Sequence, residues 1–338
     1  MTEGRYRLIG STASPYAIKL RALLRYRRIP FDWVIMTKAL RKATEHLRPN
    51  LIPVLQYPDG TYRGETTTLA YDLESRHKER SVIPDDKAVA FVCDLLEDLA
   101  DEWAVKPLFL YRWWDPEDQA YVSRWAGEEW SVSEAETGSR GGDRAIPPAA
   151  DFAHGHSRRD GGKQAAAGRE LLADAGGIRA ACRHDQLSVR QPAVARRFRL
   201  VRPAQRDGDR PDADADHARE GAVHRSLGAA AGRCLGRRGE WYPREQALGG
   251  MAEALLKIAG ELYLPFLVAN AEAFAKGLER LEMNVWGLPY ALAPFKYQVK
   301  CLQQLRDKFS ALDADSRAAL RPVLERTGCW QHLARRLS

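Results

Sequence analysis

Two serines stand where a strand gives way to a helix, and their hydroxyls could stabilise a negative charge. Residues Tyr6–Gly10 have the pattern of a short strand, Ser11 follows directly, and Ser14 precedes Pro15. Serine is a favoured N-cap and proline suits the first helical position, so a helix is predicted to begin here. A helix N-terminus offers partial positive charge and free N–H groups, to which a hydroxyl adds a donor. Ser14 is the first candidate for this role and Ser11 the second; the alternative is that Ser14 only caps the helix.

A second group of candidate residues lies on a hairpin and on the helix that follows it. Residues 52–57 and 61–63 are predicted to form two short antiparallel strands, joined by a Pro-Asp-Gly turn. Pro53 and Val54 open the first of these strands, and Glu65 and Thr66 stand just before and at the start of the helix predicted over 66–76. The hydroxyl and N–H groups of Thr66 could receive a carboxylate, although both residues could also serve only as helix caps.

The elements around these residues predict a fold. A strand at 6–10, a helix after Pro15 and a strand at 31–36 form a βαβ unit, and hence a parallel pair. A polar helix near 39–47, the hairpin and the helix at 66–76 complete an order of βαβ followed by ββα. This is the thioredoxin-like arrangement. From residue 86 on the pattern changes to helices, predicted at 89–103, 116 to about 127, 246–281 and 294–312, with a last short one ending near 328. The fold class is thus an α/β thioredoxin-like N-terminal domain followed by an all-α domain.

The N-terminal residues resemble the glutathione transferase family. The run Tyr6 to Tyr16, with its Ser-Pro-aromatic start, looks like the first strand and helix of that family. The segment Ile52-Pro53-Val54-Leu55 looks like its x-P-x-L segment, in which the proline is typically cis. Glu65-Thr66 resembles its acidic-or-amide plus hydroxyl pair, with Thr in place of the usual Ser. The resemblance covers residues 5–130 well and extends plausibly to 241–338, and it assigns no class within the family.

The resemblance implies roles for these residues in binding glutathione. A glutathione thiol has a pKa of roughly 9, so an enzyme must stabilise its thiolate, and Ser14 or Ser11 is placed to do so. A cis Pro53 would leave the backbone of Val54 open to pair with the tripeptide, whereas a trans proline at a strand start is the alternative. Glu65 and Thr66 would take the γ-glutamyl end. Tyr6 lies at the wrong end of its strand for a tyrosine-based mechanism.

The function implied is conjugation of glutathione to an electrophilic small molecule, with glutathione as co-substrate and no other cofactor, in a homodimer. A glutathione-dependent thiol–disulfide oxidoreductase is disfavoured because no cysteine precedes Cys93. A non-catalytic glutathione-binding or interaction protein on the same fold remains an alternative, since fold does not imply function. One departure concerns Asn50-Leu51, where many relatives have a Gly-Lys pair for the glycyl carboxylate.

Composition limits the partners and the compartment. The formal net charge of +7 does not indicate a nucleic-acid partner, because residues 131–240 alone supply +5 of it. Five scattered cysteines without a C-x-x-C pair fit a reducing cytosol, and the polar N-terminus does not have the pattern of a signal peptide. The most apolar run, 262–269, is too short to span a membrane. We therefore expect a cytoplasmic protein that is not bound to a membrane.

Residues 131–240 differ in composition from both flanks. This segment contains 19 Arg, 22 Ala and 15 Gly in 110 positions, with no Trp, Tyr or Met. Such a composition offers too little apolar surface for a core. We interpret it as out-of-frame reading of a GC-rich gene, with a natural disordered insert as the alternative. A one-base shift near codon 131, reversed near 240, should restore an amphipathic helical pattern in the nucleotide sequence. If the shift is real, the chain as written could be a non-functional product.

The predicted domains follow from these observations. Residues 1–83 form the glutathione-binding domain, 84–130 begin the helical domain, 131–240 are the anomalous segment, and 241–338 complete the helical domain. Four residues have side chains that could bind a metal ion: His154, His156, Cys182 and His184. They all lie in the anomalous segment, where no predicted helix or strand holds their geometry. No metal site is predicted.

Overall fold

The computed structural model describes residues 4–106, 108, 112, 116–135 and 240–334. The prediction of a disordered middle segment therefore falls almost wholly on 136–239, outside the described residues, as do the four metal-ligand candidates. One boundary does change. Helix α6 (Pro116–Ala135) crosses the expected end of the helical pattern at residue 130 and is longer than predicted.

The N-terminal part contains one four-stranded sheet with the order β2-β1-β3-β4. Strands β1 (Tyr6–Gly10) and β2 (Phe31–Ile35) pair in parallel, with Leu8 opposite Trp33. Strand β3 (Val54–Gln56) pairs antiparallel with β1 and with β4 (Tyr62–Arg63). This topology confirms the thioredoxin-like arrangement that the order of elements predicts.

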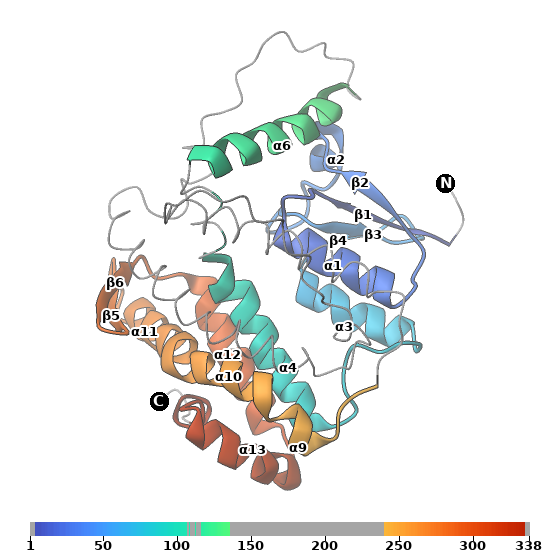
Figure 1. The fold of residues 1–338 in the computed structure, drawn as a ribbon. Helices are drawn as coiled ribbons and strands as arrows, with labels where there is room; N and C mark the ends of the chain where they lie inside the picture. Colours follow the sequence, from blue (N-terminus) through green and yellow to red (C-terminus); the bar gives the residue numbers. More distant parts are fainter. Residues whose placement is uncertain (1–3, 107, 109–111, 113–115, 136–239, 335–338) are drawn as a thin grey trace, which may run out of the picture.

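Helices α1 and α3 pack together on one face of this sheet (Figure 1). Their leucines share a buried core with the inward side chains of β1 and β3, which is why the apolar residues of α1 recur at spacings of three and four. The helices of this part are α1 (Pro15–Tyr26), α2 (Lys38–Ala43) and α3 (Thr66–Arg76). This core draws on residues up to Leu73 and none beyond it.

The second part is built around helix α4 (Lys87–Leu99), which Asp86 caps through the N–H of Val89. Figure 1 shows the later helices gathered about α4, and α6 standing apart from them. Within the described residues, two segments are π-helical, η1 (Ala100–Ala104) at the end of α4 and η3 (Ala259–Tyr263). The remaining helices are α9 (Arg244–Ala247), α10 (Gly250–Ile258), α11 (Leu264–Ala275), α12 (Lys296–Ser310), α13 (Ala314–Arg326) and α14 (Trp330–Leu333).

The core of this second part joins residues from both sides of the 136–239 gap. Apolar side chains of α4 are buried against those of α10, η3, α11, α12 and α13. Gly260 in η3 lies so close to the 327–329 segment that a Cβ atom there would sit 1.9 Å from the carbonyl oxygen of Thr327. Only glycine fits such an approach of two backbones. A polar contact reaches this core too, since the hydroxyl of the buried Tyr263 donates to the partly buried Asp98 over 2.7 Å.

A β hairpin adds to the helical second part. Strands β5 (Leu281–Val285) and β6 (Leu288–Leu292) are antiparallel and are joined by Trp286 and Gly287, both with positive φ. Two such residues between two strands are typical of a type I′ turn. The all-α prediction is therefore right for the helices but left out this hairpin.

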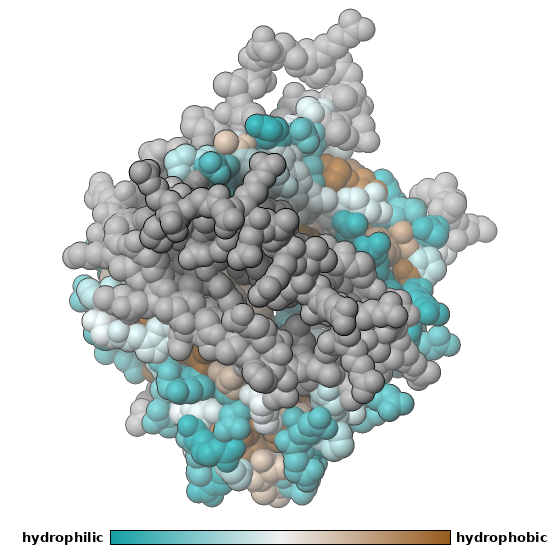
Figure 2. Space-filling view, in the orientation of Figure 1, coloured by the Kyte–Doolittle hydropathy of each residue, from teal (hydrophilic) through white to brown (hydrophobic). Residues whose placement is uncertain are grey.

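The surface of the described helices is mixed. On the face drawn in Figure 2, hydrophilic residues predominate over the described helices at the lower edge, around α9 and α13, with apolar residues between them. No helix within the described residues is both long and apolar enough to cross a membrane.

Candidate functional site

The turn between β1 and α1 carries the first two candidate residues. Ser14 is the N-cap of α1, and its Oγ accepts a hydrogen bond from the N–H of Ala17 over 3.3 Å. Its backbone N–H donates to the carbonyl oxygen of Ser11 over 3.1 Å. The capping role of Ser14 is thus confirmed. Its hydroxyl proton has no acceptor among the described residues, so capping and donation to a ligand are compatible at this position.

The hydroxyl of Ser11 is already engaged. Its Oγ donates to Oε2 of Glu129 on α6 over 2.5 Å and accepts from the N–H of Ala13 over 3.1 Å. Thr12 donates to Oε1 of the same carboxylate twice, from its backbone N–H over 2.9 Å and from its hydroxyl. The carboxylate of Glu129 therefore lies against the turn that the sequence suggests as an anion site.

Two more side chains from the second part hold this turn. The indole N–H of Trp125 on α6 donates to the hydroxyl oxygen of Thr12 over 2.8 Å. The guanidinium of Arg112 donates to the carbonyl oxygen of Ala13 over 2.7 Å, and burial lowers the pKa of Arg112. Both contacts, like those of Glu129, join residues about a hundred positions apart, so periodicity within one element could not reveal them.

Pro53 and Val54 lie beside the same turn. The peptide bond between Ile52 and Pro53 is cis, as the resemblance implied. A Cβ atom added to Gly10 would lie 2.9 Å from the Cβ of Ala17 and 3.7 Å from the Cβ of Pro53, so β1, α1 and the proline converge on this glycine. The side chain of Val54 is fully buried and its backbone pairs with Ile9. In the described ladder, pairing between β3 and β4 begins only at Leu55, so no strand covers Val54 on its β4 side.

Glu65 and Thr66 begin helix α3. Glu65 has φ 72° and ψ 98°, a sparsely populated conformation for a residue with a side chain, and it makes no side-chain cap. The Thr66 side chain is buried, and its hydroxyl accepts a hydrogen bond from Nζ of Lys19 over 3.5 Å. Because Lys19 lies five residues after Ser14 on α1, this contact brings the start of α3 next to the first turns of α1.

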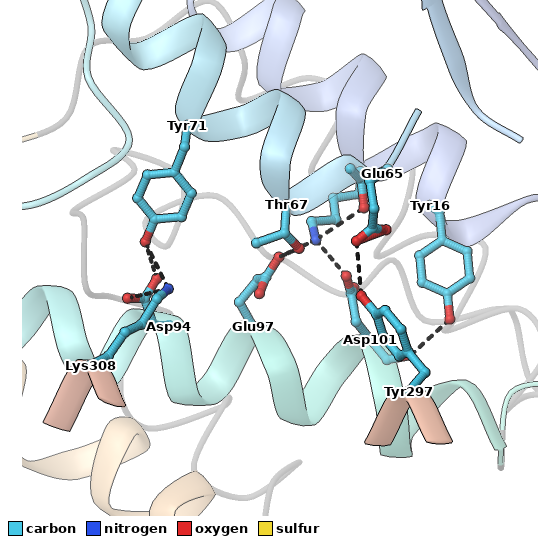
Figure 3. Close-up of polar contacts among 11 residues, drawn as sticks. Tyr16, Glu65, Thr67, Tyr71, Asp94, Glu97, Asp101, Tyr297 and Lys308 are labelled. Atoms are coloured by element: carbon cyan, nitrogen blue, oxygen red, sulfur yellow. Dashed lines mark hydrogen bonds and ion pairs between the residues drawn. The ribbon is translucent and has the colours of Figure 1, made fainter. Parts of the chain in front are cut away.

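Lys19 is the centre of a charged group that the sequence did not reveal, and two carboxylates of this group, Glu97 and Asp101, are labelled in Figure 3. Its Nζ contacts the carboxylates of Glu97 and, over 2.6 Å, Asp101, while Thr67 donates to Glu97 over 2.7 Å. Burial lowers the pKa of Lys19, but the two carboxylates more than offset this, so the net pKa is raised. Glu97 and Asp101 are four residues apart and so share one helix face. That spacing was a signal that a cation lies opposite.

A tyrosine from the second part contacts Glu65. The hydroxyl of Tyr297, on α12, donates to the Glu65 carboxylate over 2.8 Å (Figure 3). Tyr16 lies nearby on α1 and donates to the carbonyl oxygen of Asp101 over 2.8 Å, and burial raises its pKa further above the usual value. Both tyrosines thus stay protonated and act as donors.

The segment before Pro53 has a basic neighbour. The guanidinium of Arg41, on α2, donates to the carbonyl oxygen of Asn50 over 3.4 Å, and the amide of Asn50 donates back to the carbonyl oxygen of Arg41 over 3.2 Å. Arg41 is therefore a cation close to the place where many relatives carry a lysine.

Tyr6 lies at the start of β1, at the end of the strand away from the Ser11–Ser14 turn. Its hydroxyl pairs with Nε2 of His77 over 3.0 Å, and burial raises the pKa of Tyr6.

Metal-ligating residues do not gather in the described ranges. No group of three or more His, Cys, Asp or Glu side chains in 4–106, 108, 112, 116–135 and 240–334 is arranged to hold a metal ion.

Comparison with known proteins identifies the family of the N-terminal part. Residues 8–81 match the family model of the glutathione S-transferase N-terminal domain. The matched range contains Ser11, Ser14, Pro53, Val54, Glu65 and Thr66. The resemblance stated from the sequence is confirmed, and this domain belongs to the glutathione S-transferase family.

Three solved structures illustrate the likeness over part of the chain. A glutathione S-transferase of Methylobacterium radiotolerans in complex with glutathione sulfonate is 24% identical, covers 41% of this chain and 68% of its own, and has a TM-score of 0.23. Ure2p in complex with glutathione is 15% identical, with 40% and 67% covered and a TM-score of 0.29. A glutathione S-transferase of Pseudomonas fluorescens is 19% identical, with 46% and 86% covered and a TM-score of 0.26. No curated protein matched the chain.

Proposed function

We propose that this chain binds glutathione between the β1–α1 turn, Pro53 and the start of α3, and conjugates it to an electrophilic small molecule. The observation that carries the proposal is the convergence of these segments within the family-matched domain. Pro53 and Ala17 both lie next to Gly10, and Lys19 of α1 reaches Thr66 of α3. One extended tripeptide could meet all of them.

Each part of glutathione has a partner of suitable chemistry. The backbone of Val54, uncovered on its β4 side, can pair with the peptide as an added strand. Thr66, with the Lys19 ammonium beside it, suits the γ-glutamyl carboxylate, and the Glu65 carboxylate suits the γ-glutamyl ammonium. Arg41 suits the glycyl carboxylate in place of the missing Gly-Lys pair.

Ser14 is the preferred group for stabilising the thiolate. Its hydroxyl proton has no acceptor among the described residues, whereas the proton of Ser11 goes to Glu129. Ser14 also stands at the N-terminus of α1, where the helix adds a partial positive charge.

Replacing Ser14 and Thr66 separately tests this assignment. Ser14→Ala should leave glutathione binding largely intact and reduce turnover, since losing one donor to an anion typically costs on the order of 2–4 kcal/mol of transition-state stabilisation. Thr66→Ala should instead weaken glutathione binding first. The assay is conjugation to a generic aromatic electrophile, with binding measured by calorimetry. Equal turnover of Ser14→Ala and wild type would transfer the role to Ser11 or to backbone N–H groups.

A matched control separates catalysis from helix capping. Thr37 caps α2 as Ser14 caps α1, with its Oγ accepting from Leu40 over 3.1 Å. Thr37→Ala should cost about 1 kcal/mol of stability, as the loss of a cap does, without reducing turnover. A comparable fall in turnover for both variants would attribute the Ser14 effect to capping.

A non-catalytic glutathione-binding protein is the second candidate, and the Glu129 carboxylate is the observation that favours it. A negative charge beside the thiol disfavours the thiolate. A folded protein that binds glutathione and turns over no electrophile would support this alternative.

A further inference from the structure

The carboxylate of Glu129 occupies the β1–α1 turn in the manner of a bound anion. It accepts from the Ser11 hydroxyl over 2.5 Å, from the Thr12 N–H over 2.9 Å and from the Thr12 hydroxyl. In the described part of the chain no Lys, Arg or His forms an ion pair with it. Among the described residues, its charge is therefore balanced by neutral donors and by the N-terminus of α1.

Donors of this kind bind anions in general. Two hydroxyls and a backbone N–H converge at the end of a strand, just before a helix N-terminus, and such concave groups of donors take phosphate, sulfonate or carboxylate groups. The occupant comes from α6, more than a hundred residues further along the chain. The turn thus holds an internal carboxylate with donors of the kind that bind anions.

The element that carries Glu129 is weakly anchored. Of the described side chains of α6, only that of Val122 is buried, whereas α11 buries six side chains. Figure 1 shows α6 apart from the other helices of the second part. A helix with so little buried apolar surface can move away at a low cost in free energy. No described side chain of α6 belongs to either of the two apolar cores, so a movement of α6 leaves both cores packed.

We propose that the β1–α1 turn is an anion-binding site, that Glu129 fills it when no ligand is bound, and that an anion at the sulfur position of a glutathione derivative binds by displacing Glu129. This rests on the proposed function for the identity of the ligand, but the anion site itself does not depend on it. Glu129 is then a specificity-determining residue. It penalises ligands with a negative charge at sulfur and leaves those with a neutral group there almost unaffected.

The test compares two variants of neighbouring residues in the full chain. Glu129→Gln keeps the size and removes the charge, and Glu128→Gln is the matched control because its side chain is exposed. The probes are glutathione sulfonate, which is charged at the sulfur position, and S-methylglutathione, which is neutral there. Glu129→Gln should bind glutathione sulfonate about 10-fold more tightly than wild type, because the sulfonate then displaces a neutral amide, whose hydrogen bonds to the turn are weaker than those of a carboxylate. Binding of S-methylglutathione should change less than about 2-fold, and Glu128→Gln should match wild type for both.

A third probe separates this inference from the proposed function. Sulfate should raise the melting temperature of Glu129→Gln more than that of wild type or Glu128→Gln, and Thr12→Val in the Glu129→Gln background should remove the gain. If S-methylglutathione fails to bind wild type, the proposed function is wrong, while the sulfate result still decides on the anion site. An equal response to sulfate in all variants overturns the inference.

A measurement on the wild-type protein tests the proposal even if Glu129→Gln does not fold. Hydrogen exchange of the α6 amides should speed up when glutathione sulfonate is added and stay unchanged with S-methylglutathione. Slower exchange in α6 with the sulfonate would mean that Glu129 stays in place, and would overturn the proposal.

Discussion

At the Thr66 end of the candidate site the Lys19 ammonium faces the carboxylates of Glu97 and Asp101, whereas at the Ser11 end the Glu129 carboxylate faces three uncharged donors. Both ends are thus held by residues from the second part of the chain. At the first end opposite charges compensate each other, and at the second a single charge has no counterion among the described residues. The first arrangement fixes two parts of the molecule against each other, and the second can be exchanged for a ligand.

The largest effect is expected on stability, when the Lys19 ammonium is removed. Lys19→Met leaves two part-buried carboxylates four residues apart without their cation, so it should lower the free energy of unfolding by about 2–3 kcal/mol at neutral pH. The loss should shrink in acid, where the carboxylates become protonated. Denaturant titrations measure it, with Lys42→Met on the exposed side of α2 as control. Equal stability of Lys19→Met and wild type would mean that the ion pairs do not hold the two parts together.

The next largest effect is expected on stability and glutathione binding at the Ser11 end, when Gly10 is replaced. Gly10→Ala places a Cβ atom 2.9 Å from that of Ala17 and 3.3 Å from the ring of Trp33, so β1 and α1 must shift apart. The cost should be about 1–2 kcal/mol, typical of modest overpacking. Glutathione binding should weaken more than the stability loss alone explains, because Pro53 lies on the same glycine. Gly64→Ala, where a Cβ atom meets nothing within 4 Å, is the control. Unchanged glutathione binding in Gly10→Ala would mean that the β1–α1 turn is not part of the glutathione site.

The third prediction concerns the dependence of stability on pH, and it involves Glu102, the neighbour of Asp101 at the Thr66 end. Burial, together with the nearby carboxylates of Asp98 and Asp101, raises the pKa of Glu102 to about 7, against the opposing effects of Gln298 and Lys106. The folded state therefore holds this proton more tightly than the unfolded state, and stability should fall as pH rises from about 4.5 to about 7. In Glu102→Gln this fall should be smaller, because the neutral amide does not titrate. Melting curves from about pH 5 to about pH 8 measure the difference. Parallel pH profiles would contradict the assignment, although Asp98, whose pKa burial raises to about 6, should retain part of the slope.

The smallest effect is expected at Tyr297. Tyr297→Phe removes the hydrogen bond to Glu65, and both residues are exposed, so stability should change by less than about 1 kcal/mol. Binding of glutathione should weaken by about 2- to 5-fold if this bond orients the Glu65 carboxylate for the γ-glutamyl ammonium. Tyr121→Phe, an exposed tyrosine on α6, is the control, with binding measured by calorimetry. Unchanged glutathione binding in Tyr297→Phe would mean that the hydrogen bond from Tyr297 does not orient the Glu65 carboxylate.

Local signals predicted most elements of the N-terminal part closely, although α2 ends at Ala43 and not near residue 47. Helix α3 begins and ends at the predicted residues, because Leu69 and Leu73 mark its buried face and Pro58 to Gly60 separate it from the strands before it. The cis Pro53 followed from the family resemblance, and Ser14 caps its helix as its residue type predicts. These features depend on neighbours within a few residues.

The parts that could not be predicted depend on distant residues or on unusual turn chemistry. The contacts of Glu129 with Ser11 and of Lys19 with Glu97 join positions 118 and 78 residues apart. The β5–β6 hairpin was missed because Trp286 takes the first turn position, at φ 47°, where asparagine or glycine is usual. Only Gly287 hinted at the turn.

The central position of α4 has a consequence for synthesis on the ribosome. Its apolar face packs against α10, α11, α12 and α13, all of which follow residue 240 in the chain. At typical translation speeds the residues between α4 and α10 take roughly 7–30 s to be made. During that time the N-terminal domain can already fold on its own core, while Val89, Val92 and Leu95 wait for their partners. The newly made helix thus exposes apolar surface until α10 and the helices after it are made, and slower translation would prolong this exposure.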